Sequence, residues 1–298
     1  MIEFFNELEP LVLMLGIVYW GYFLYKDLTL LSDYWPQERI KTTRLAFMIV
    51  SLINVIMLLV TMHFLADYYV RTMFIYGFYY FMLGLAWIYL NLHILRRWFD
   101  LSWQYDAIQN NNKAALVTVL AVEIGATILY CGTSIGDGPG VGCVIFTLLL
   151  GLGVWLVLCF IIGKLTDIFE RITVERDVDC AIRFGAFLIA AGIILGRACA
   201  GNWTSYNATI YEFLVMWPLI PLVAAFIIGE TQYFNKEKDP IYENEENNLS
   251  PKISMLYGLL LIVLAIVIVI LLPPLPGNHM QLHFAYIAVA KIIGSIWI

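Results

Sequence analysis

Three ionisable side chains lie within or beside long apolar runs, where a charge is costly and marks a candidate functional site. Glu123 interrupts the run 114–133, so its carboxyl group could line a pore or relay protons. It could also be a protonated group that is hydrogen-bonded between helices. Arg197 could attract anions or extend to the membrane surface. His63 has the position of an interfacial residue. We take these three as candidates for a pore or transport path.

A second set of candidates belongs to the polar segments between the runs. Asn112 precedes one run, and Asp177, Asp179 and Arg183 surround the start of another. The stretch 167–183 mixes acids and bases every few residues, which is typical of a solvated, self-paired surface. It could instead bind a cytoplasmic protein or a small ligand.

The remaining motifs that carry chemistry are absent from the sequence. It has no nucleophile–base pair, HExxH motif, P-loop or dinucleotide glycine fingerprint. We therefore expect neither an enzyme nor a cofactor or metal site.

The composition indicates which solvent surrounds these residues. Hydrophobic residues make up 61% of the chain and charged residues 13%, whereas soluble domains average about 45–50% and about 25%. The surplus apolar surface must face a lipid bilayer. A net charge of −6 argues against nucleic acid as a partner, because binding to phosphates needs clustered lysine and arginine.

Long apolar runs predict an all-α integral membrane protein with about eight transmembrane helices, since a span needs about 20 apolar residues. Pro218 and Pro221 should interrupt the seventh run. The apolar tail 277–298 could be an interfacial helix, a re-entrant segment or a ninth span. The eight runs centre on residues 11–25, 45–65, 73–92, 114–133, 141–163, 181–200, 213–229 and 253–272.

The loops between the runs predict the orientation. Of the 17 lysine and arginine residues, 14 fall in the first, third, fifth and seventh loops. Positively charged loops stay in the cytoplasm, so these loops are predicted to be cytoplasmic and the N-terminus to lie outside.

The polar loops also recur along the chain. Polar-to-apolar junctions fall near Thr43, Asn112, Asp177 and Asn247, a period of roughly 65–70 residues. Each period holds one inward helix, a cytoplasmic loop and one outward helix, which predicts four parallel two-helix repeats. We divide the chain into a first repeat pair (1–140), a second repeat pair (141–276) and the tail 277–298. Small residues in the second and third units, such as Gly125 and Gly192, should let helices approach closely.

The two best-matching segments, 105–136 and 164–201, resemble the bacterial inner-membrane family called domain of unknown function 350, here in tandem. The unit of that family is a helix, a polar turn, a Gly-Asn-X-Ala-X-Ala-like start and a helix rich in small residues. Asn111 and Arg176 stand where that motif has glycine, and Asp177 stands where it has asparagine. The resemblance implies a multi-pass protein of the bacterial inner membrane and supplies no reaction.

Three functional hypotheses remain. Parallel repeats and scarce intramembrane charge favour a homo-oligomeric ion channel or pore with a narrow, mostly apolar path. Glu123 and the two prolines would also suit a small-solute transporter. The charged loops would suit a membrane scaffold that recruits a cytoplasmic partner.

Overall fold

The computed structural model describes residues 11, 14–19, 21, 22, 25, 41–136, 140–201, 205–234 and 251–272. Within these residues the chain is helical, and its β-structure is limited to one bridge between Ala66 and Ile135. The prediction of an all-α membrane protein is therefore confirmed at that level. The run 11–25 is described only in part, and the tail 277–298 lies outside the described residues.

Seven helices of the described part have the length and apolar composition to cross a bilayer. They cover the second to eighth predicted runs. Their bounds are Thr42–Leu65, Phe74–Phe99, Lys113–Thr133, Val141–Thr166, Val178–Cys199, Tyr206–Phe234 and Pro251–Leu271.

Two of these spans contain more than one helical element. The first combines α3 (Lys41–Val60) with the π-helical turn η2 (Thr61–Leu65), and the short α4 (Tyr68–Thr72) follows it. The single-helix spans are α5 (Phe74–Phe99), α6 (Lys113–Thr133), α7 (Val141–Thr166), α9 (Val178–Cys199) and α12 (Pro251–Leu271). The connecting η3 (Trp103–Gln109) precedes α6, and α8 (Ile168–Thr173) precedes α9.

The sixth span of this set is broken. It consists of α10 (Tyr206–Phe213), the 3₁₀ turn η4 (Leu214–Met216), α11 (Leu219–Ile228) and the π-helical η5 (Gly229–Phe234). Pro218 is the N-cap of α11. A proline lacks the N–H that would continue the helical hydrogen bonds, so the predicted interruption at the two prolines is confirmed.

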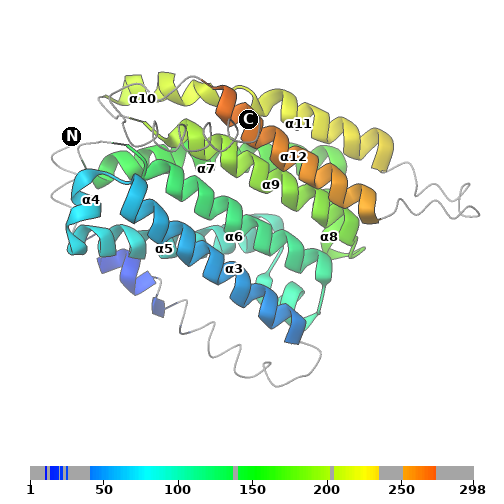
Figure 1. Ribbon diagram of the computed structural model, residues 1–298. Coiled ribbons are helices and arrows are strands. Elements are labelled where there is room, and N and C mark those ends of the chain that lie inside the picture. Colours follow the sequence, from blue (N-terminus) through cyan, green and yellow to red (C-terminus); the bar gives the residue numbers. More distant parts are fainter. Residues whose placement is uncertain are drawn as a thin grey trace, which may run out of the picture.

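The helices form two layers (Figure 1). In one layer α3, α6, α9 and α12 lie side by side in that order, and all four run in the same direction. The return helices α5, α7 and α11 pack against this layer. The four parallel helices begin at the end of the bundle where α8 lies. We call it the basic end because Arg96 lies in the last turn of α5, while Lys113 and Lys252 lie in the first turns of α6 and α12.

Glycines hold α6 and α9 together along their whole length. A Cβ atom added to Gly132 would lie 2.1 Å from the carbonyl oxygen of Gly196, and one added to Gly192 would lie 2.8 Å from that of Gly125. The two backbones therefore touch. Close contact of this kind replaces the hydrophobic effect as the driving force for helix association in lipid.

Two units of the chain share the same series of backbone turns. Asp100 and Asp167 adopt left-handed conformations (φ of 50° each) after α5 and α7. Asn111 (φ 48°) and Arg176 (φ 59°) do so again just before α6 and α9. Glycine adopts this conformation without strain. This gives a physical reason why the family motif that these segments resemble has glycine at the two positions. The total of four repeats stays a prediction.

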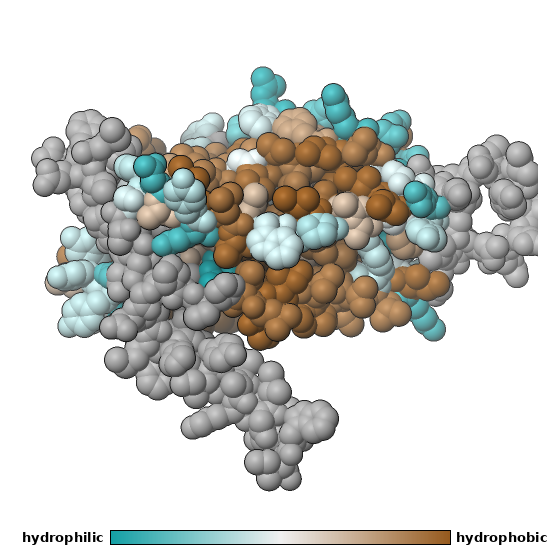
Figure 2. Space-filling model, turned by 90° about the horizontal axis from the view of Figure 1, so that it is seen from above, coloured by the Kyte–Doolittle hydropathy of each residue, from teal (hydrophilic) through white to brown (hydrophobic). Residues whose placement is uncertain are grey.

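The outer surface suits a bilayer. Figure 2 shows an apolar band across the middle of the bundle with hydrophilic residues toward its ends. On α3 and α12 the large exposed side chains are aliphatic, among them Met48, Leu52, Leu260 and Val263. The described part thus has the surface of a multi-pass membrane protein. Which side of the membrane the basic end faces stays a prediction.

Candidate functional site

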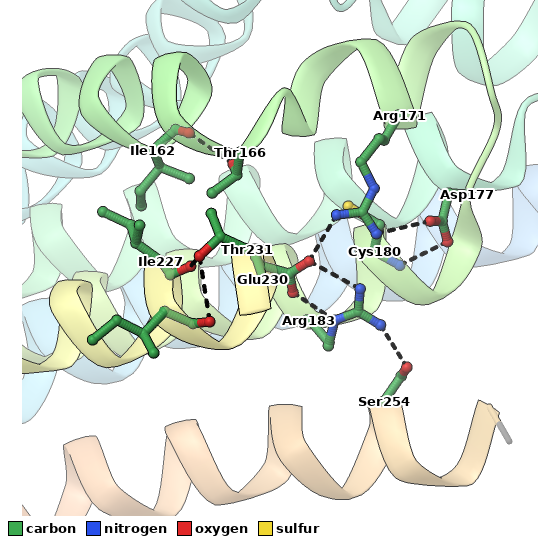
Figure 3. Close-up of polar contacts among 11 residues, drawn as sticks. Ile162, Thr166, Arg171, Asp177, Cys180, Arg183, Ile227, Glu230, Thr231 and Ser254 are labelled. Atoms are coloured by element: carbon green, nitrogen blue, oxygen red, sulfur yellow. Dashed lines mark hydrogen bonds and ion pairs between the residues drawn. The ribbon is translucent and has the colours of Figure 1, made fainter. Parts of the chain in front are cut away.

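A buried ionic network lies near the basic end of the bundle (Figure 3). At its centre is Glu230 of η5, which is 1% exposed. Its carboxylate accepts hydrogen bonds from Nη1 of Arg171 (2.9 Å) and from Nε and Nη2 of Arg183 (2.5 and 3.0 Å). Both arginines are also buried, at 4% and 2% exposure. Such charges are stable away from water only when they are paired and hydrogen-bonded.

The arginines extend the network to two further elements. Nη1 of Arg183 donates to Oγ of Ser254 on α12 (2.8 Å), and its guanidinium lies 3.9 Å from the ring centroid of Phe234. Nη2 of Arg171 donates to Oδ2 of Asp177 (3.0 Å). The network therefore joins α8, α9, η5 and α12. It balances two positive charges with two carboxylates.

The charge of Arg171 depends on these neighbours. Burial alone disfavours the guanidinium cation. The surrounding Cys180, Glu230 and Asp177 outweigh burial and raise the pKa of Arg171 above its ordinary value. Arg171 thus stays positively charged, and its burial makes the nearby acidic partners necessary for stability.

Asn112 and Asp177 begin helices. Oδ1 of Asn112 accepts from the backbone N–H groups of Ala114 and Ala115, while its Nδ2 donates to the carbonyl oxygen of Ile172 at 2.8 Å. Asp177 caps α9 through Oδ1, which accepts from the N–H of Cys180. These caps satisfy backbone donors at the helix starts, and Asn112 also ties the start of α6 to α8.

The predicted loop contacts are thus mostly engaged within the chain itself. Asn112 and Arg183 are buried, and Asp177 and Asp179 are half-buried in the turn before α9 and in its first residues. A cytoplasmic partner of the described protein would reach Asp179 and Asp177 more readily than the other two.

A second group of buried polar side chains lies in the middle of the bundle. Glu123 is the central residue of α6 and is buried. Nδ2 of Asn54, in the middle of the span Thr42–Leu65, lies 3.4 Å from Oε2 of Glu123. Asn54 is 2% exposed, and its Oδ1 has no hydrogen-bond partner among the described residues. A carboxyl group and a side-chain amide therefore meet at mid-depth between α3 and α6.

The other two predicted path residues lie away from Glu123. Arg197 is half-buried in the last turn of α9, where its charge interacts with that of Glu212 on α10. His63 is exposed on η2, with its ring 4.5 Å from that of Phe64. Both belong to the end opposite the basic end. The three side chains are thus spread along the depth of the bundle.

Asn54, Arg171 and Glu230 were not singled out from the sequence. Glu230 follows directly on an apolar run and lies 59 and 47 positions from its two arginines. The sequence did offer one signal for Glu230: it is an acidic residue at the end of a span, on the side where the loops are basic. Among the described residues no cluster of three potential metal ligands occurs.

No protein-family model matches the chain, and neither the curated proteins nor the solved structures contain a detectable relative of it.

Proposed function

We propose that the protein is an ion channel of a bacterial inner membrane, built from several copies of this chain, with Glu123 beside the permeation path. The observation that supports this proposal most directly is the contact between Glu123 and Asn54 at mid-depth of two spans. A carboxyl group at the centre of a bilayer costs several kcal/mol, so its presence is a functional hypothesis by default.

The two buried carboxylates among the described residues have different surroundings. Glu230 accepts three short hydrogen bonds from two arginines and joins four elements. Glu123 faces an amide nitrogen at the long distance of 3.4 Å, beside an amide oxygen that lacks a described partner. The first arrangement is that of a structural ion pair. The second places a carboxyl group beside a neutral side-chain amide at mid-depth, where a permeating ion would cross.

The exposed faces fit an assembly of copies. The outer face of α3 carries large aliphatic side chains, including Met48, Leu52, Ile56 and Leu59, on the same helix that supplies Asn54. A second copy packed on this face would enclose the region between α3 and α6. The cytoplasmic location of the basic end follows from its lysines and arginines and belongs to the same proposal.

A small-solute transporter is the second candidate, because the span Tyr206–Phe234 is discontinuous. Transporters place substrate sites at broken helices. The recruitment of a cytoplasmic partner has less support, since Asn112 and Arg183 are buried in contacts with the chain itself.

Ionic current through the purified protein in a planar bilayer tests the proposal. We expect discrete currents that change in size or selectivity in Glu123→Gln, because the substitution removes the charge at nearly constant volume. Glu170→Gln is the matched control, since Glu170 is exposed on α8 outside the spans, and it should leave the currents unchanged.

Two results would contradict parts of the proposal. Currents that are the same in Glu123→Gln and the original chain would remove Glu123 from the path. The absence of current together with saturable, Glu123-dependent solute uptake into proteoliposomes would establish the transporter instead.

A further inference from the structure

A small, partly open cavity lies between α5, α6, α7, α8 and α9, apart from the pair of Glu123 and Asn54. Its volume is about 30 Å³. At one level it is lined by Asn91 and Trp155, and toward the basic end by the rings of Phe99, Phe169 and Phe184. The volume admits one or two water molecules. It is too small for a lipid chain, a hydrated ion or an organic solute.

Trp155 lines this cavity and carries a hydrogen-bond donor without a described partner. The residue is 4% exposed, and its Nε1 finds no partner among the described residues. The position of its ring is fixed by Gly125, because a Cβ atom there would lie 2.9 Å from Cη2 of the indole. A buried donor without a partner costs about 1–3 kcal/mol, so an acceptor in the cavity would stabilise the fold.

Asn91 supplies the second polar group. Its Nδ2 donates to the carbonyl oxygen of Trp87 at 2.9 Å, which fixes the side chain and leaves Oδ1 as its acceptor. The remaining wall is largely aliphatic and aromatic. An occupant must therefore accept a hydrogen bond from the indole, and it can donate one to the amide oxygen. Among molecules of this size, water has both properties.

We propose that the cavity is a binding site for water, held between the indole N–H of Trp155 and the side chain of Asn91. The three phenylalanine rings line the site toward the basic end. Phe99 and Phe169 stack with centroids 4.6 Å apart, and Phe169 meets Phe184 edge-on at 5.5 Å. The water thus lies within the membrane-spanning part, next to a group of aromatic rings. This inference does not depend on the channel proposal.

Water contact at the indole protons tests the site directly. The full chain is perdeuterated, labelled with ¹⁵N at its nine tryptophan indoles and placed in lipid nanodiscs. Trp155→Phe identifies the signal of Trp155. We expect magnetisation transfer between water and the Trp155 indole proton. Trp87 is the internal control: it is also buried, but its Nε1 donates to the carbonyl of Ala126 at 3.1 Å, so it should show no such transfer.

A second variant separates a bound water from general water penetration. Asn91→Leu fills part of the cavity and removes its acceptor, so the water signal at Trp155 should disappear while the indole resonance persists. The proposal is overturned if Trp155 shows no water contact in the original chain. It is equally overturned if the contact survives in Asn91→Leu or appears to the same extent at Trp87.

Discussion

The buried ionic network makes Glu230→Gln the most informative stability test. The substitution keeps the side-chain volume and one acceptor oxygen but removes the negative charge. Arg171 and Arg183, both nearly inaccessible to solvent, then face each other across a neutral amide. Asp177 keeps its contact with Arg171, and Arg183 keeps only its electrostatic interaction with the half-buried Asp179 among the described carboxylates.

The expected magnitude follows from this geometry. Removing one partner of a buried pair typically costs 3–5 kcal/mol, because the remaining charge stays buried and uncompensated. Glu230 serves two arginines through three hydrogen bonds, so we expect a loss of about 3–5 kcal/mol in the free energy of unfolding. The assay is reversible unfolding of the purified protein in mixed micelles with increasing denaturing detergent.

Two further variants make the test sharp. Glu170→Gln removes an exposed carboxylate and should change the free energy of unfolding by less than about 0.5 kcal/mol. The double variant Arg183→Met with Glu230→Gln removes a matched pair and leaves Arg171 with Asp177. It should therefore be more stable than Glu230→Gln alone. A Glu230→Gln protein of unchanged stability, or a double variant no better than the single one, would refute the electrostatic reasoning.

Two other substitutions test the backbone. Arg176→Gly should raise the free energy of unfolding by about 0.5–1 kcal/mol in the same assay, because glycine removes the left-handed strain at φ 59°. The control Val174→Gly, at the ordinary φ of −92°, should lower the free energy of unfolding. Gly132→Ala should cost about 3 kcal/mol, because the new Cβ atom would meet the backbone of Gly196. Gly153→Ala, with open space around the position, should be neutral or slightly stabilising, and equal effects at positions 132 and 153 would contradict the glycine contact.

The spans were predictable because lipid imposes a simple requirement on the sequence. A continuous apolar run of sufficient length has few alternatives to a membrane helix, and the seven described spans cover seven of the predicted runs. The break in the span Tyr206–Phe234 was predictable from Pro218 and Pro221 for the same local reason. Its start was not, since Thr209 and Glu212 make the first turns too polar to be recognised as part of the run.

The polar contacts were beyond the reach of the sequence. Glu123 was recognisable because it interrupts an apolar run, but its partner Asn54 lies 69 positions away. The pairing of Glu230 with Arg171 and Arg183 depends on how η5 packs against α8 and α9. Periodicity predicts which face of a helix is apolar, and it does not predict which neighbour a charged residue will meet. The same holds for Arg183, which looked like a loop residue and is buried.

The contact between α6 and α9 also has a consequence for biosynthesis. The two helices run in the same direction, so the chain must cross the membrane once more, as α7, before α9 can reach α6. Paired glycines such as Gly132 and Gly196 are about 65 residues apart, and ribosomes add about 5–20 residues per second. During translation, α6 is thus synthesised about 3–13 s before α9, the helix against which it packs. Over that interval its glycine face and Glu123 must be shielded by lipid, by α3 and α5, or by the insertion machinery.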